Sequence, residues 1–132
     1  MRDILFRGKR IDNGEWAEGQ YAYLLNFRTE DGEPIKHMIL DGTPFGQTVD
    51  PSTVGQYTGL TDKNGKRIFE GDLITIPGSK RQGLPAPVKW SNFDARFEVC
   101  RRGFNPICLD GDEGIYEVIG NIHDNCEFLE GE

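Results

Sequence analysis

The chain has 132 residues, 36% of them hydrophobic, which is the size of one ordinary domain with enough apolar side chains for a core. No run approaches the roughly 20 apolar residues of a membrane helix, and the start lacks the apolar core of a signal peptide, so we expect neither membrane insertion nor export. The three cysteines, Cys100, Cys108 and Cys126, form no disulfide framework, which predicts free thiols and a cytoplasmic location.

The net charge of -7 is concentrated at one end of the chain. Residues 103–132 contain no Lys or Arg and eight of the 22 acids, which leaves 14 acids against 15 basic side chains in residues 1–102. The acids of the final stretch are Asp110, Asp112, Glu113, Glu117, Asp124, Glu127, Glu130 and Glu132. The first ten residues, in contrast, are basic. We therefore expect the two ends to pair or to face different partners.

Taken in chain order, the first predicted element is a β-hairpin around Asn13-Gly14, a dipeptide that suits a tight turn with positive φ. Strand-like runs at residues 4–6 and 16–25 flank this turn. Asp31-Gly32 predicts a second hairpin between runs at 21–27 and 35–40. Together these runs predict an N-terminal β-hairpin lobe.

Residues 41–50 are interrupted by Gly and Pro, so we expect an irregular loop there and place a possible boundary between two lobes, 1–49 and 50–132, at its end. Asp50 and Pro51 then predict one short helical turn, with Asp50 as its cap.

Short strands separated by turns are predicted for the rest of the chain, at residues 66–69, 73–76, 88–90, 96–101 and 115–119. This pattern favours a small barrel or sandwich. The fold class predicted from the sequence is therefore mainly β, a small SH3-like barrel plus the N-terminal hairpins, with few helical turns. A last turn of helix is possible at 124–129.

Two stretches, residues 54–73 and 118–125, resemble the YopX family of phage and prophage proteins at the level of consecutive residues. Phe6-Arg7-Gly8-Lys9 and Gly14-Glu15-Trp16 add to this similarity, which spans nearly the whole chain. The resemblance implies a single YopX-like domain over residues 1–132, encoded by a phage or prophage, β-rich with an SH3-like barrel element and of unestablished function. It transfers no catalytic residues.

The residues of the shared stretches suit a structural role, because Asn, Asp and Gly serve turns. The residues in question are Gly55, Tyr57, Thr58, Gly59, Asp62, Asn64, Gly65, Glu70, Gly71, Asp72, Gly120 and Asn121. Tyr57, Asp62, Glu70 and Asp72 could instead line a site. Turn capping and strand pairing are the favoured interpretation.

Catalytic and metal chemistry find little support in the sequence. A zinc site would use Cys100, Cys108, His123 and Cys126, yet only one close pair exists where structural zinc sites usually have two. A Cys-His nucleophile with His37 or His123 needs a spatial arrangement that the sequence does not show. The acids Asp110, Asp112 and Glu113 resemble a cation loop, but the position that needs glutamate holds Asn121.

No Gly-Lys-Ser/Thr phosphate loop is present, so we expect no nucleotide hydrolysis and no cofactor. Nucleic-acid binding is an open alternative, because basic and aromatic side chains together can contact single strands. The candidates are Lys80, Arg81, Lys89, Trp90, Phe93, Arg101 and Arg102. Scattered solvated charge is the favoured interpretation of this set.

The preferred hypothesis is a non-enzymatic accessory protein that acts through protein contacts, as a homo-oligomer and with an unknown phage or host protein. The alternative is a nucleic-acid-binding small barrel. No membrane contact is expected.

Overall fold

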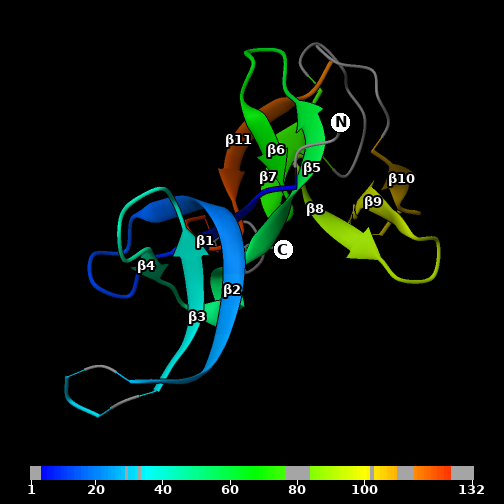
Figure 1. Cartoon of the computed structure of the whole chain (residues 1–132). Coiled ribbons are helices and arrows are strands. Elements are labelled where there is room, and N and C mark those ends of the chain that lie inside the picture. The colour runs from blue at the N-terminus through cyan, green and yellow to red at the C-terminus, as the bar shows by residue number, and fades with distance from the viewer. Residues whose placement is uncertain are drawn as a thin grey trace. The chain divides into compact units, whose positions relative to one another are not determined.

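The computed structural model describes residues 4–28, 30–32, 34–76, 84–101, 103–109 and 115–125 (Figure 1). The chain divides into two compact units, residues 1–57 and 58–132. The described residues are mainly β-strand, and their helical content is a single 3-10 turn, so the predicted fold class is confirmed at this level.

The first unit is an antiparallel sheet. Its elements are β1 (Phe6–Lys9), β2 (Trp16–Arg28), β3 (Pro34–Leu40), β4 (Gln47–Thr48), the 3-10 turn η1 (Pro51–Thr53) and the beginning of β5 (Gly55–Thr61). The strands lie in the order β4-β3-β2-β1-β5.

The hairpin around Asn13-Gly14 is confirmed. Gly14 has a φ of 72°, and the Asn13 side chain accepts a hydrogen bond from the backbone N–H of Glu15 at 2.9 Å. The first strand begins at Phe6 and runs to Lys9, later than the run at 4–6 predicted. It extends over polar residues because β1 lies between β2 and β5, which hold its backbone from both sides.

The second hairpin, β2–β3, is also confirmed, with a register shift between Tyr23 and Phe27. The stretch 41–50 is not wholly irregular, since it contains β4, which pairs with β3. After β4, Val49 forms an isolated bridge with Arg10. The sequence analysis missed β4 because the strand has only two residues and lies in a stretch interrupted by Gly and Pro.

The core of the first unit is small and centred on Val49. Ala17, Ile39 and Val49 are buried, and Phe6, Tyr21 and Val54 pack against them. A Cβ added to Gly8 would lie 3.0 to 3.2 Å from three atoms of the Val49 side chain, so the glycine leaves room for this packing.

Residue Asp50 caps η1 as predicted. Its carboxylate accepts hydrogen bonds from the backbone N–H and the hydroxyl of Ser52, at 3.0 and 2.9 Å. Pro51 occupies the first position of the turn.

The second unit contains two sets of strands. The remainder of β5 pairs with β6 (Arg67–Phe69), and a five-stranded antiparallel sheet has the order β10-β9-β8-β7-β11. Its members are β7 (Asp72–Thr75), β8 (Ala86–Ser91), β9 (Arg96–Val99), β10 (Ile107–Cys108) and β11 (Glu117–Asn121). In the described parts of the chain these sheets are open and close no barrel, so the SH3-like barrel stays a prediction.

The strands predicted at 66–69, 73–76, 88–90, 96–101 and 115–119 are all present, with ends that differ by at most two residues. Strands β5 and β10 were not predicted. Glycine is unfavourable in strands, so Gly55 and Gly59 argued against a strand at β5. Gly59 has a φ of 92° within this strand. The predicted turn at 124–129 extends beyond the described residues.

The core of the second unit is larger. It consists of Ile68, Ile74, Ala86, Val88, Val99, Leu109 and Tyr116, which are all buried. Val88 and Val99 face each other across the β8–β9 pair and are fully buried. Within the described residues no helix is long and apolar enough to cross a membrane.

Candidate functional site

The carboxylate of Asp62 organises the turn at Asn64-Gly65. One of its oxygens accepts backbone N–H bonds from Asn64 and Lys66, at 2.8 and 2.9 Å, and the other accepts from Val118 at 3.1 Å. Gly65 supplies the positive φ, 80°, that the turn requires. The side chain of Asp62 therefore joins the β5–β6 turn to β11, 56 residues along the chain.

The environment of Asp62 favours its ionised form. Burial, which leaves only 4% of the residue exposed, would by itself raise the pKa. The hydrogen bonds from Val118, Lys66 and Asn64, with the charge of Lys66, outweigh burial and hold the pKa below its usual value. Asp62 is thus an anion that accepts hydrogen bonds from three backbone N–H groups.

A second network surrounds Asn121 at the end of β11. The side-chain oxygen of Asn121 accepts N–H bonds from His123 and Asp124, at 2.9 and 2.8 Å, and its amide donates to the Asp124 carboxylate at 2.9 Å. The Asn121 N–H donates a hydrogen bond to the side-chain oxygen of Asn125 at 3.1 Å. A Cβ on Gly120 would lie 2.3 Å from the Asn125 side-chain oxygen, so any other residue there would displace the Asn125 side chain.

The two stretches shared with the family lie side by side in this unit, because β7 pairs with β11. The Lys63 N–H donates to the Tyr116 carbonyl and the Ile122 N–H to the Gly71 carbonyl, at 2.8 and 2.9 Å. Lys63 also forms an ion pair with Glu117 at 2.9 Å. The segments are far apart in sequence and form one framework.

The other residues of the shared stretches have structural surroundings too. Asp72 accepts the Phe69 N–H at 2.8 Å and is buried, and the Thr58 hydroxyl donates to the Ile68 carbonyl at 2.8 Å. Tyr57 is buried, and Glu70 is half-buried in the turn before β7. The contacts of Asp72 and Thr58 hold strands and turns.

The described members of the predicted basic and aromatic set, Lys89, Trp90, Phe93 and Arg101, do not form one patch on the same face of a strand. Lys80, Arg81 and Arg102 lie outside them. Lys89 and Trp90 are neighbours in β8, so their side chains point to opposite faces of the strand.

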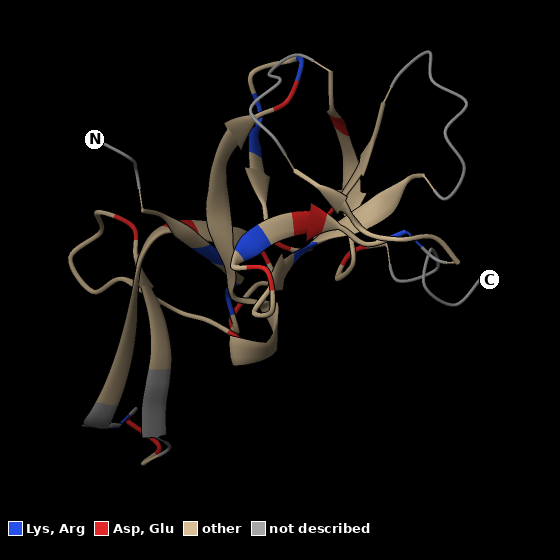
Figure 2. Ribbon diagram, turned by 90° about the vertical axis from the view of Figure 1, so that its right-hand side faces the viewer, with Lys and Arg blue, Asp and Glu red and all other residues tan. Residues whose placement is uncertain are grey.

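Arg101 lies beyond the end of β9, where its guanidinium stacks over Phe104 at 5.1 Å. Trp90 pairs with Phe97 near the start of the same strand. Figure 2 likewise shows basic and acidic positions spread over several described elements.

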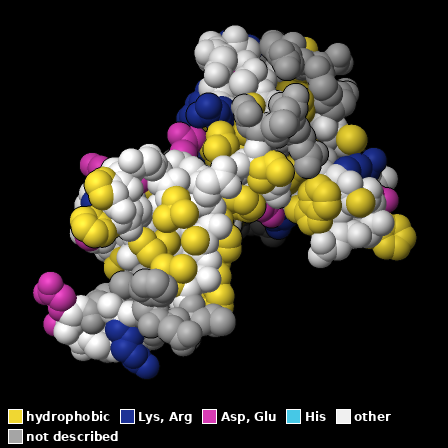
Figure 3. Space-filling model, viewed as in Figure 1, with side chains coloured by type: hydrophobic (Ala, Val, Ile, Leu, Met, Phe, Trp, Pro, Cys, Tyr) yellow, Lys and Arg dark blue, Asp and Glu magenta, His cyan; other side chains and the backbone are white. Residues whose placement is uncertain are grey.

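The tip of the β8–β9 hairpin displays an aromatic side chain. Phe93 is 97% exposed. Below it, the rings of Trp90 and Phe97 pack edge to face with their centroids 5.0 Å apart, and Trp90 remains 44% exposed. Figure 3 shows hydrophobic side chains gathered over this hairpin.

The conformation of this tip is held by side chains. The Ser91 hydroxyl accepts the Asp94 N–H at 3.1 Å, and the Trp90 indole N–H donates to the Asn92 side chain at 2.8 Å. Ala95 has a φ of 53°, a left-handed conformation that is strained for a residue with a Cβ. Two hydrogen bonds and one left-handed residue therefore fix the turn that exposes Phe93.

On the reverse face of the hairpin, Arg96 binds the nearly buried carboxylate of Glu98 at 2.9 Å. The hydrogen bond from Arg96 lowers the pKa of Glu98, and the same bond raises the pKa of Arg96. Asp94 lies 3.9 Å from the same guanidinium. Arg96 therefore forms ion pairs with Glu98 and Asp94 within this hairpin.

The thiols and carboxylates considered for metal binding are dispersed or undescribed. Cys100 is half-buried, and burial raises the pKa of its thiol, whereas Cys108 is exposed on β10. Cys126 and the acids Asp110, Asp112 and Glu113 lie outside the described residues. Among the residues that the structure does describe, no three His, Cys, Asp or Glu side chains gather as a metal site would require.

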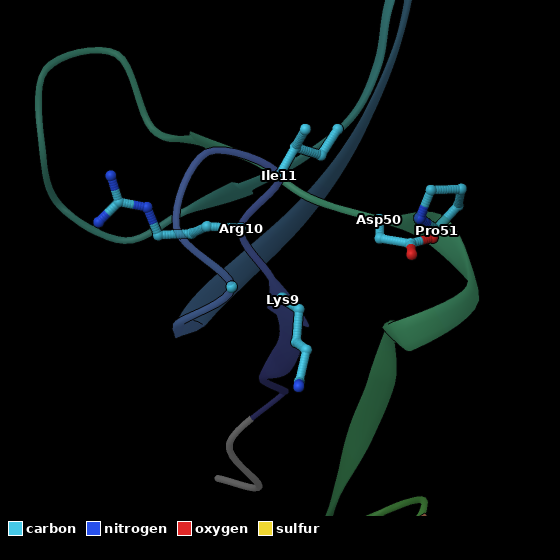
Figure 4. Close-up of a pocket in the computed structure, with 6 residues that line it drawn as sticks. Lys9, Arg10, Ile11, Asp50 and Pro51 are labelled. Carbon is cyan, nitrogen blue, oxygen red and sulfur yellow. The ribbon is translucent and has the colours of Figure 1, made fainter. Parts of the chain in front are cut away.

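An open cavity of about 440 Å³ lies in the first unit, where β1 ends near η1. Its lining residues are Lys9, Arg10, Ile11, Gly14, Asp50 and Pro51. Arg10 is bound to Asp12 at 2.7 Å, and its guanidinium points away from Asp50 and Pro51 in Figure 4. Ile11 is 66% exposed, so the cavity combines apolar surface with the charges of Lys9 and Asp50.

Neither the cavity nor the display of Phe93 was predicted from the sequence as a site. The Ser91-to-Ala95 segment carries turn residues that predict a hairpin loop, which was the available signal for an exposed Phe93. The cavity depends on the approach of η1 to β1, through the hydrogen bond from the Lys9 N–H to the Thr53 hydroxyl, and no local pattern indicates that contact.

Comparison with known proteins gives a family and a fold. The sequence profile of the family described as YopX protein matches residues 5–130. The chain is similar to the crystal structure of protein EF1440 from Enterococcus faecalis, with a TM-score of 0.55 and 24% identity over 98% of this chain and 99% of that one. At this identity the likeness shows the fold alone. No curated protein matches the chain.

Proposed function

Because this chain belongs to the YopX family, we propose that it is a phage- or prophage-encoded accessory protein that acts without catalysis, through contacts with copies of itself and with a phage or host protein. In this proposal it works in the cytoplasm of the host bacterial cell, away from the membrane. The second unit then serves as an SH3-like scaffold that presents the contact surface.

The observation that carries this proposal is the display of Phe93 above the Trp90–Phe97 pair. Aromatic side chains are enriched where proteins bind each other, and they supply a large contact area at low conformational cost. A side chain that is 97% exposed on a braced turn gains nothing from its own fold. Contact with a partner protein would give this ring the burial that the monomer does not.

The hydrogen-bond networks support a non-catalytic role. The polar residues of the family stretches are engaged by backbone groups, as with Asp62 and its three N–H donors. Catalytic acids and bases need access to a substrate and pKa values near the working pH. Asp62 is buried and its pKa is lowered, which suits neither task.

The proposal is tested by light scattering of the purified protein over a range of concentrations, together with affinity capture from a lysate of an infected host. We expect species larger than the monomer and at least one captured protein. A monomer at every concentration, with nothing captured above background, would contradict the proposal.

Nucleic-acid binding is the competing function, and the separation of Lys89, Trp90 and Arg101 described above does not favour it. It is measured by fluorescence titration with single- and double-stranded DNA and with RNA at low salt. Phosphate contacts release counterions, so real binding would weaken steeply as salt rises.

A further inference from the structure

We propose that the Phe93 ring of one copy of the chain inserts into the cavity beside Ile11 and Pro51 of a second copy. The chain thus carries a knob, the tip Ser91–Ala95, and a hole, the cavity of about 440 Å³ in the first unit. This inference rests on the self-association in the proposed function and names the surfaces that carry it.

The knob is prepared for insertion before it meets a partner. Its hydrogen bonds, from Asp94 to Ser91 and from Trp90 to Asn92, already order the turn that presents Phe93. Binding therefore loses little conformational entropy at the tip, which is the general advantage of a preorganised contact. A phenylalanine also has few rotatable bonds to restrict.

The hole has suitable size and lining. A cavity of about 150 Å³ can hold a benzene molecule, so the larger, open cavity here has room for a phenyl ring with space at its rim. Ile11 and Pro51 are exposed in this unit. A ring that covered them would remove their apolar surface from water, which is favourable. Figure 4 shows these two side chains on different segments of the cavity wall.

One pair of opposite charges can meet across the two surfaces. Asp94 follows Phe93 directly in the knob, with its side chain 45% exposed, and Lys9 lines the hole. An inserted Phe93 would bring the Asp94 carboxylate to the rim where the Lys9 ammonium can meet it. Across the interface this pair would set orientation more than affinity.

The same charges disfavour a polyanion as the occupant of the tip. Lys89 and Arg96 on the β8–β9 hairpin are balanced by Asp94 and Glu98, and Arg96 is bound to both acids. A nucleic acid or an anionic membrane would therefore meet no net positive charge there. The neutral hairpin and apolar ring suit a protein cavity.

The knob and the hole are different surfaces of one chain. Two copies that each insert a knob into the other's hole would form a closed symmetric dimer. If each copy instead offers its knob to one neighbour and its hole to another, the result is a closed ring or an open filament, according to the rotation between copies.

The experiment is light scattering of the full chain and three variants. Phe93→Ser removes the knob and Ile11→Glu charges the hole, and both positions are exposed, so each variant should fold. Each alone is expected to be monomeric where the unaltered protein assembles. Phe45→Ser is the matched control, because Phe45 is 88% exposed and belongs to neither surface; it should assemble normally.

Mixing the two monomeric variants is the decisive step. The Phe93→Ser chain keeps its hole and the Ile11→Glu chain keeps its knob, so an equimolar mixture should form one-to-one dimers that grow no further. Circular dichroism of each variant confirms that monomers are folded.

Other outcomes overturn the inference in separable ways. If the unaltered protein assembles and both variants do so equally, or if their mixture stays monomeric, the knob and hole are not the interface and the proposed function stands. Loss of assembly in Phe45→Ser to the same degree also counts against this site. If the unaltered protein is monomeric at every concentration, self-association itself fails.

Discussion

Two hairpin turns of the second unit use their side chains in opposite ways. The turn at Asn64-Gly65 is tied inward by Asp62, whose carboxylate is buried and fully used by backbone donors. The turn at Phe93 is braced so that its aromatic ring points to solvent. The comparison shows that Asp62, in a stretch that resembles the family, is used within the fold, while the most exposed aromatic ring of the two turns, Phe93, lies outside those stretches.

The largest effect that this comparison predicts is that of Asp62→Asn. The amide would keep one acceptor oxygen and present a donor to a backbone N–H, so we expect the free energy of unfolding to fall by about 3 kcal/mol. Urea denaturation measures it. The control is Asp94→Asn in the other turn, which is exposed and should change stability by less than about 0.5 kcal/mol. If Asp62→Asn and Asp94→Asn lowered the free energy of unfolding equally, the two turns would not differ in how they use their carboxylates.

The pH dependence of Asp62 follows from its lowered pKa. In the folded protein the pKa of the Asp62 carboxyl lies below its ordinary value of 3.8. The contribution of Asp62 to the free energy of unfolding is therefore present above that ordinary value and is lost as the pH falls through the folded pKa. The stability difference between the unaltered protein and Asp62→Asn should therefore shrink between pH 6 and about pH 3. Urea titrations at several pH values test this, and a constant difference would contradict it.

A smaller loss is expected for Asn121→Ala. The substitution leaves the N–H groups of His123 and Asp124 without their acceptor in a partly buried turn, which costs about 2 kcal/mol. Hydrogen exchange should accelerate at these two amides first. If exchange there is unchanged, Asn121 does not order this turn.

Replacing Ala95 by Gly in the Phe93 turn should have the opposite sign. Glycine relieves the left-handed strain at this position, partly offset by its greater freedom in the unfolded chain, for a gain of about 0.5 kcal/mol. Thermal unfolding at fixed concentration measures it. A clear loss of stability would mean that the turn is not strained.

The smallest effect on folding is predicted for Phe93→Ser. The ring is exposed, so the free energy of unfolding should change by no more than about 0.5 kcal/mol even though assembly is lost. Denaturation at a concentration where both proteins are monomeric separates these two quantities. A large loss there would show that Phe93 belongs to the fold.

Local signals in the sequence were enough for much of the second unit and for both N-terminal hairpins. Asn13-Gly14 and Asn64-Gly65 predicted turns that the structure contains. The sequence also predicted that Asp50 caps a short helical turn with Pro51 at its first position. These features depend on side chains within a few residues of each other, so nearby sequence is sufficient to specify them.

Features that depend on distant partners were missed. Strand β5 forms in spite of its glycines because β1 and β6 hold it, and Val49 forms a bridge with Arg10, far earlier in the chain. Strand propensity is weak against such tertiary context. Only part of the predicted basic and aromatic set is described, and within it the adjacency of Lys89 and Trp90 in sequence places their side chains on opposite faces of a strand.

The amino-acid sequence by itself determined the β character of the chain, its main turns and its membership of the YopX family. Only the tertiary structure decided that Asp62 reaches Val118, that Asn121 closes the end of β11 beside Gly71, and that Phe93 remains exposed. The physical reason is that turns are encoded by short-range backbone preferences, whereas burial and strand pairing depend on which distant segments pack together.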